Sequence, residues 1–353
     1  MGPWMEMKMK MEIETAQTPE RAQRMARAQR MARALAPAST FTALVALVAL
    51  VALVSDLPAA AADEGNPKRT WGTVRTPAVG EPLAIGGYSA GCLQGGQPLP
   101  LHGEGYQVMH PSRMRYFGHP DLIAFLQQLG KSVRAEGLGV MLLGDLSQPR
   151  GGRASGGHAS HQSGLDVDIW YWHPRRARKK LLSMEERERL KARTVVNGKK
   201  EAIREQWSDH VAELLRLTAE HPRVQRVFVH PIIKRELCAR TWKQRDWMAK
   251  IRPWHGHADH LHVRLLCPEN NPECQPQPPV PAGDGCQELE WWFSEEARAD
   301  RQKALRKYRS KVVGKRVMPE RCAEVLTAPP LQLGDENDTG GDAEKPRSST
   351  RER

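Results

Sequence analysis

Six cysteines constrain the fold of this 353-residue chain more than any other feature, and all of them follow a long apolar segment: Cys92, Cys238, Cys267, Cys274, Cys286 and Cys322. An even number of cysteines in an exported chain predicts disulfides, here three, which staple distant segments together. The spacing does not choose among the possible pairings. A structural zinc site is the competing interpretation. Disulfides are favoured over it because the chain has no C-x-x-C pair, and six residues separate the closest two cysteines, Cys267 and Cys274.

Residues 1–62 are typical of a secretory signal peptide with an extended n-region. The segment Phe41–Val54 has fourteen residues without a charge, too few for a membrane-spanning helix, which needs about 20. Arginines precede this segment, and Pro58 and the alanines at 59–62 follow it, so we expect cleavage near Ala61 or Ala62. An uncleaved membrane anchor is the alternative. Export and disulfides together predict a protein of the periplasm or the cell exterior, with no stable membrane insertion after signal cleavage, and we expect the periplasm.

The chain is strongly basic. Its net charge is +12, and residues 1–62 hold seven Lys and Arg against five Asp and Glu, so the remaining residues carry +10. Such a charge favours an anionic partner, which could be nucleic acid, anionic lipid or an anionic polymer. Because the chain is expected to be exported, we predict no nucleic-acid partner. A solvated basic surface without a specific partner is the alternative.

Apolar periodicity in residues 63–326 predicts helices and strands that mix without regular alternation, which favours an α+β fold. Helices are expected at Asp121–Glu136, Trp207–Glu220, Pro231–Cys238 and Arg245–Ile251. Strands are expected at Leu138–Leu143, Leu165–Trp172, Arg223–His230 and Asp259–Leu266. Ser147–Gly164 and Pro268–Asp284 are rich in Gly or Pro and are expected to be loops. Residues 327–353 lack apolar periodicity and are predicted to form a disordered polar tail.

Histidines cluster at two places in the chain. One cluster contains His158 and His161, and the other contains His255, His257, His260 and His262. If Asp259–Leu266 is a strand, alternation places Leu261, Val263 and Leu265 on the core face, and His260, His262 and Arg264 on the opposite face. Two imidazoles at neighbouring positions on one face can then serve a single site.

The first cluster is followed by a strand that carries two carboxylates. Alternation there points Leu165, Val167 and Ile169 inward, and Asp166, Asp168 and Trp170 the other way. Gly164 permits a sharp entry into this strand, so a loop histidine can fold back over a carboxylate. Taken singly, these aspartates fit turn caps and these histidines fit surface residues. Taken together, two histidines and a carboxylate with an open position are typical of a catalytic zinc site, although iron, copper and nickel are alternatives.

Four segments resemble the penicillin-insensitive murein endopeptidases: YQVMHPSRMRYFGHPDL at 106–122, GGHASHQSGLDVDIW at 156–170, HADHLHVRLLCP at 257–268 and GDGC at 283–286. The likeness runs from about Trp71 to Cys322, which is nearly the whole mature chain. It implies the fold of the lysostaphin, D-Ala-D-Ala metallopeptidase and hedgehog group, a small antiparallel sheet with flanking helices.

The resemblance also implies roles for individual residues. In that group an H-x₆-D motif and the second histidine of H-x-H bind one zinc ion, and these ligands correspond here to His161, Asp168 and His262. The first histidine of H-x-H, here His260, lies beside the metal and serves catalysis. His257 and His158 match further active-site histidines, with His158 a candidate fourth ligand.

The family further implies the disulfides Cys92–Cys322, Cys238–Cys286 and Cys267–Cys274. Some relatives have an Asp and a His where this chain has Asn197 and Lys200, so a second, peripheral metal is not expected here.

The function that the resemblance implies is zinc-dependent hydrolysis of the D-alanyl–meso-diaminopimelyl cross-links of peptidoglycan. A zinc mechanism needs no serine acyl-enzyme, so β-lactams are expected not to inhibit it. The nearest alternative is a zinc D,D- or L,D-carboxypeptidase that acts on stem peptides. A non-catalytic zinc-containing wall-binding module and a secreted nuclease are more distant alternatives. No oligomeric state is assigned.

Overall fold

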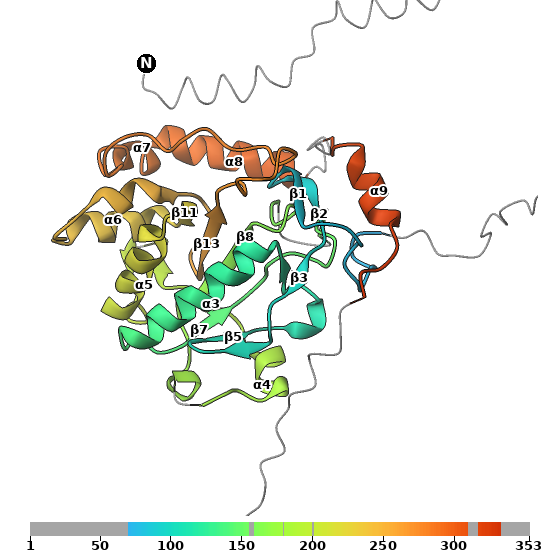
Figure 1. The fold of residues 1–353 in the computed structure, drawn as a ribbon. Coiled ribbons are helices and arrows are strands. Elements are labelled where there is room, and N and C mark those ends of the chain that lie inside the picture. Colours follow the sequence, from blue (N-terminus) through green and yellow to red (C-terminus); the bar gives the residue numbers. More distant parts are fainter. Residues whose placement is uncertain (1–69, 155–158, 179, 200, 310–316, 333–353) are drawn as a thin grey trace, which may run out of the picture. The chain divides into compact units, whose positions relative to one another are not determined.

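A seven-stranded sheet carries the candidate residues in the computed structural model, which describes residues 70–154, 159–178, 180–199, 201–309 and 317–332 (Figure 1). All of these belong to one unit, residues 66–353. The strands are, in spatial order, β12 (Ile251–Pro253), β11 (Val224–Val229), β13 (His260–Leu265), β8 (Asp166–Trp170), β7 (Met141–Leu143), β5 (Tyr106–Val108) and β4 (His102–Gly103). Within the described ranges, every helix is too short or too polar to cross a bilayer.

The centre of the sheet is antiparallel and its outer parts are mixed. Neighbouring strands from β11 through β13 and β8 to β7 run antiparallel. The pairs β11–β12 and β5–β7 are parallel. The predicted α+β class is therefore confirmed, while the sheet is larger than expected and not wholly antiparallel.

Three further strand pairs and the helices surround this sheet. The additional antiparallel pairs are β1 (Leu83–Gly87) with β2 (Ala90–Gln94), β3 (Gln97–Pro98) with β6 (Phe117–Gly118), and β9 (Val196–Asn197) with β10 (Ala202–Ile203). The α-helices are α3 (Pro120–Ala135), α4 (Met184–Arg189), α5 (Asp209–Glu220), α6 (Pro231–Ala239), α7 (Leu289–Trp292), α8 (Glu295–Arg309) and α9 (Arg321–Thr327). Short 3₁₀ helices are η1 (Pro111–Arg113), η2 (Arg175–Arg178) and η3 (Asp246–Lys250).

One face of the sheet forms the main core. Helix α3 begins with Pro120 at its first position and with the His119 side chain, which accepts a hydrogen bond from the Asp121 amide. Its apolar side and that of α5 pack with the inward residues of the strands into one buried cluster, which includes Leu122, Phe125, Leu126, Leu215, Val167, Ile169, Leu261 and Val263. Helix α3 crosses the sheet in the view of Figure 1. The opposite face at the centre of the sheet is left to polar side chains.

Most predicted elements are confirmed within a few residues. The expected helices at 121–136, 207–220 and 231–238 correspond to α3, α5 and α6, and the one at 245–251 is the 3₁₀ helix η3. The strand expected from Leu138 begins only at Met141, because Gly137 and Gly139 adopt positive φ angles of 66° and 101° that interrupt an extended chain. The hairpin β1–β2 was not predicted, since its sequence is Gly-rich and lacks clear alternation.

Three disulfides tie the periphery to this core, and they are the pairs that the resemblance implies. Cys92–Cys322 joins β2 to α9 across 230 residues of sequence. Cys238–Cys286 fixes the end of α6, and Cys267–Cys274 closes a short loop after β13. The predicted signal peptide and residues 333–353 of the predicted tail lie outside the described residues. Within the described start of this tail, at residues 327–332, the Leu331 amide donates a hydrogen bond to the Pro77 carbonyl at 2.9 Å.

Candidate metal centre

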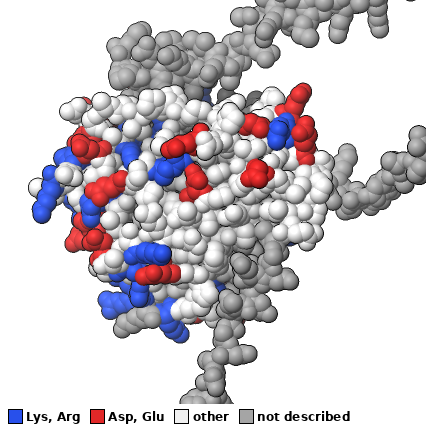
Figure 2. Space-filling model, in the orientation of Figure 1, with Lys and Arg blue, Asp and Glu red and all other residues white. Residues whose placement is uncertain are grey.

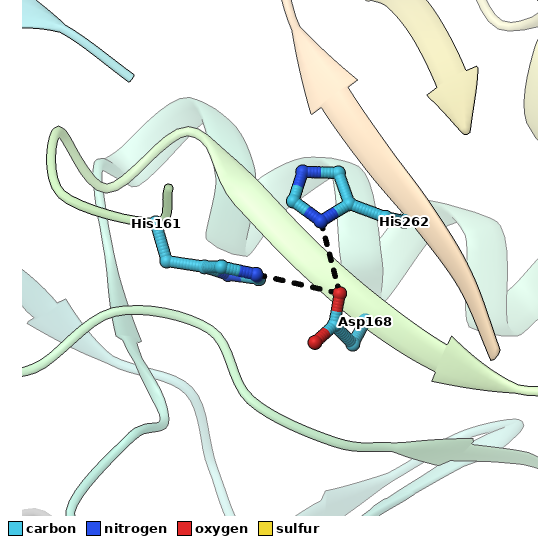
Figure 3. Close-up of side chains that lie close together, drawn as sticks. All are labelled: His161, Asp168 and His262. Atoms are coloured by element: carbon cyan, nitrogen blue, oxygen red, sulfur yellow. Dashed lines mark ion pairs between the residues drawn. The ribbon is translucent and has the colours of Figure 1, made fainter. Parts of the chain in front are cut away.

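Three buried side chains converge on the polar face of the central strands (Figure 3). Asp168 lies in β8, and His262 lies directly opposite it in β13. His161 comes from the loop before β8. These two histidines and the aspartate were the predicted ligands, and strand alternation places the two sheet residues on the face that the sequence predicted.

The distances between these side chains suit a metal ion. His161 Nε2 lies 3.4 Å and His262 Nδ1 lies 3.1 Å from the same oxygen, Asp168 Oδ1. One ligand atom from each residue lies within 4.8 Å of the others. Atoms bound to zinc at about 2.0 to 2.1 Å in a tetrahedron are about 3.4 Å apart. Two imidazoles, which bind metal in their neutral form, and one carboxylate therefore fit a single divalent ion. Each of the three side chains is no more than 6% exposed.

Asp166 connects the parts of this centre, although no role was predicted for it. Its carboxylate forms a two-pronged ion pair with Arg264, at 2.8 Å to Nε and 3.0 Å to Nη2. It also accepts the His161 amide at 3.0 Å and lies 3.5 Å from His262 Nε2. Burial alone would raise the pKa of Asp166, but the Arg264 guanidinium and the His262 imidazole together outweigh burial and hold the pKa far below its ordinary value. Such a carboxylate fixes the orientation of metal-binding imidazoles.

The loop ligand depends on an unusual backbone conformation. His161 has a φ of 66°, in the left-handed region that non-glycine residues rarely adopt. Gly164, which leads into β8, has a φ of 75°, and a Cβ added to it would lie 2.7 Å from the Leu93 side chain. The hydrogen bond from the His161 amide to Asp166 offsets the cost of this conformation.

His260 lies beside the three candidate ligands. Its Nε2 is 3.6 Å from Asp168 Oδ1, and its Nδ1 is 2.6 Å from Asp259 Oδ1. Burial would lower the pKa of His260, but the carboxylates of Asp168 and Asp259 outweigh it and raise the pKa to about 9. The aspartate that orients His260 is the preceding residue, Asp259. No role was predicted for Asp259 from the sequence.

His257 is also brought to this centre. Its ring centroid is 5.1 Å from that of His260 and 5.6 Å from that of His262. Burial lowers the pKa of His257 to about 3, so this imidazole is neutral at ordinary pH. His158, the predicted candidate for a fourth ligand, lies outside the described residues.

Strand alternation predicted the face on which Asp168 and His262 lie, and the family resemblance supplied the predicted ligand set, but neither predicted the residues that support it. Asp166 and Arg264 were placed on the correct face without a function. Their pairing becomes visible only when β8 and β13 are aligned in register, which puts Arg264 opposite Asp166.

Comparison with known proteins finds one family and several similar relatives. A family model described as penicillin-insensitive murein endopeptidase matches residues 84–327. Proteins of that name from Yersinia enterocolitica and Haemophilus influenzae are similar to this chain, with 45% identity over 226 residues and 46% over 232 residues. The matches cover 63% of this chain in both cases, and 80% and 78% of the relatives. The protein of that name from Klebsiella pneumoniae strain 342 is 44% identical over 226 residues, which are 63% of this chain and 81% of the relative.

Proposed function

Since this chain belongs to the penicillin-insensitive murein endopeptidase family, we propose that it is a zinc-dependent endopeptidase that hydrolyses the D-alanyl–meso-diaminopimelyl cross-links of peptidoglycan. The observation that carries the zinc assignment is the convergence of His161, Asp168 and His262 on one buried point. Two histidines and one carboxylate form the ligand set of several catalytic zinc sites, in which one position stays open for water or substrate.

The bound zinc ion would supply a water whose pKa is lowered to about 7 and a Lewis acid for the substrate carbonyl. The protein itself positions and protects the ligands. Asp166, held by Arg264, orients His262 from the side away from Asp168. Burial of these groups excludes bulk water and strengthens their electrostatic interactions.

His260 is the residue that we assign to proton transfer. Its Nδ1 is fixed by Asp259, so its Nε2 is held toward the ligand carboxylate and the reacting centre. From there it would move a proton to or from the reacting atoms, or stabilise negative charge on the carbonyl oxygen of the substrate. His257, kept neutral by burial, packs behind it and is assigned an auxiliary role in the site.

The substrate and location follow from the family and the leader segment. Peptidoglycan is an anionic polymer in the periplasm, where a chain with a secretory signal would meet it. Because the proposed chemistry uses no serine nucleophile, β-lactams have no group to acylate, and the activity should persist in their presence.

The test is digestion of purified cross-linked disaccharide-peptide dimers, followed by mass spectrometry. The expected products are monomers, formed at the same rate with a β-lactam present, abolished by a chelator and restored by added zinc. Release of free D-alanine from uncross-linked peptides, with the dimers left intact, would instead identify a carboxypeptidase. Cleavage that survives complete removal of metal would contradict the zinc assignment.

A further inference from the structure

One large aromatic side chain stands exposed beside the metal centre. Trp254 is 50% exposed, whereas every other large apolar residue exposed to a similar degree in the described ranges is non-aromatic. Single exposed aliphatic residues are ordinary on protein surfaces. An exposed indole costs more free energy in water than an exposed aliphatic side chain, because its apolar area is larger. Its position near the proposed metal centre suggests that a ligand of the site covers it.

A chain of ring contacts links this indole to the metal ligands. The Trp254 ring centroid lies 6.1 Å from that of Phe228, which lies 5.4 Å from that of His262. Phe228 is itself directly opposite His262 in the sheet and packs 6.1 Å from His257. Trp254 and Phe228 therefore form a continuous aromatic surface that extends from His262 to the solvent.

The backbone holds the exposed end of this aromatic surface in place. Trp254 follows β12, whose last residue, Pro253, pairs with Val229. The Trp254 amide donates to the Val229 carbonyl at 2.7 Å. A fixed aromatic ring loses little conformational entropy when a ligand packs on it, so it is a suitable surface for binding.

We infer that Trp254 is a substrate-positioning residue whose indole packs against the aliphatic surface of the cross-linked peptide. The inference rests on the proposed function. Two ring contacts of 5.4 and 6.1 Å separate it from His262, a span that about three residues of extended peptide cover. The part of the substrate within this reach is therefore the peptide on either side of the cleaved bond, with its alanyl methyl group and the carbon chain of the diamino acid, rather than a sugar several residues away.

The position of Trp254 also predicts which kinetic constant it affects. The indole lies away from the reacting atoms, so its contact is equally strong in the bound substrate and in the transition state. Losing such a contact raises KM and leaves kcat nearly unchanged. The size of a Trp contact at a binding surface corresponds to about a tenfold loss of affinity.

The experiment compares Trp254→Ala, Trp254→Phe and a matched control, Leu181→Ala, which removes a side chain that is 47% exposed outside the site. The substrate is a sugar-free cross-linked peptide, measured beside the disaccharide-bearing dimer. We expect Trp254→Ala to raise KM about tenfold on both substrates, with kcat within about twofold, and Trp254→Phe to recover much of the loss. Leu181→Ala should match the wild type.

Zinc content and the thermal midpoint separate positioning from structure, because both should stay at wild-type values in Trp254→Ala. An unchanged KM would overturn the inference, as would a fall in kcat accompanied by loss of zinc or stability. A KM effect confined to the disaccharide-bearing dimer would show that the indole recognises sugar and would also overturn it. Calorimetric binding of an uncross-linked stem peptide tests the same contact without turnover. A wild type that binds this peptide but does not cleave the cross-linked dimer contradicts the proposed function alone.

Discussion

The proposed metal centre combines two candidate ligands on paired strands with one on a loop, and the two parts are held by different means. Asp168 and His262 face each other across β8 and β13, so backbone pairing alone sets their separation. His161 reaches the same oxygen from a loop through a left-handed backbone conformation. Strand pairing is dictated by the alternation of apolar residues, whereas the loop depends on a few specific contacts with Asp166 and Gly164.

This difference shows in what holds each part in place. The core face of β8 and β13 fixes the register of the two sheet residues, since a shift by one residue would turn Val167 and Val263 out of the core. The loop histidine is held next to them by the hydrogen bond from its amide to the Asp166 carboxylate. Asp166 is therefore the residue that joins the two parts.

The largest expected effect is the loss of metal on removal of any one ligand. His161→Ala, Asp168→Ala and His262→Ala should each lose bound zinc and at least about a thousandfold in activity, because two remaining ligands bind zinc poorly. Elemental analysis of the purified proteins measures this, with the exposed His102→Ala as the control. Retention of zinc in His161→Ala alone would show that the loop ligand is dispensable.

The next largest effect should come from Asp166→Asn. This change keeps the shape of the side chain and removes its charge, so His262 and the loop amide lose their fixed partner. Zinc affinity should fall by about 10- to 100-fold, measured by competition with a chromogenic chelator. Asp121→Asn is the control for removing an Asp–Arg ion pair outside the site, since Asp121 pairs with Arg223 at 2.7 Å in a more exposed setting. Wild-type zinc affinity in Asp166→Asn would show that Asp166 does not connect the sheet residues to the loop residue.

A smaller effect on stability is expected from Gly164→Ala. The added Cβ would lie 2.7 Å from Leu93 and 3.1 Å from the His119 amide nitrogen, at a φ of 75° that alanine disfavours. We expect a loss of about 2 kcal/mol, measured by chemical denaturation. Gly198→Ala should change stability little, because no neighbouring atom lies within 4 Å of its added Cβ. Equal stabilities of the two variants would mean that the loop entry is not strained.

The smallest effect concerns the outer surface, where charges are screened, in contrast to the buried centre. Figure 2 shows basic and acidic side chains interspersed on the face in view, rather than basic ones gathered into one large patch. We expect binding to isolated sacculi to weaken moderately between 0.1 and 1 M salt, because the Debye length falls from about 10 Å to about 3 Å. Zinc content should not change over the same range. Binding that is independent of salt would show that the net positive charge has no part in docking.

The sequence predicted the sheet-borne part of the site better than the loop-borne part, for a physical reason. Alternation along β8 and β13 needs only the apolar pattern, so the facing directions of Asp168, His260 and His262 followed directly. The placement of His161 came from the family resemblance, since nothing in the apolar pattern of a Gly-rich loop specifies a left-handed residue. The pairing of Asp166 with Arg264 needed the strand register, which depends on contacts between segments about a hundred residues apart in sequence.

The central claim is that one strand face carries both a metal ligand and a separate proton-transfer residue. Zinc content and cleavage of cross-linked dimers in His260→Ala and His262→Ala test it most directly. His260→Ala should keep its zinc and lose about a hundredfold or more in activity, whereas His262→Ala should lose zinc and activity together. Loss of zinc from His260→Ala with retention in His262→Ala would reverse the two roles, and full activity of a zinc-loaded His260→Ala would show that this histidine takes no part in the reaction.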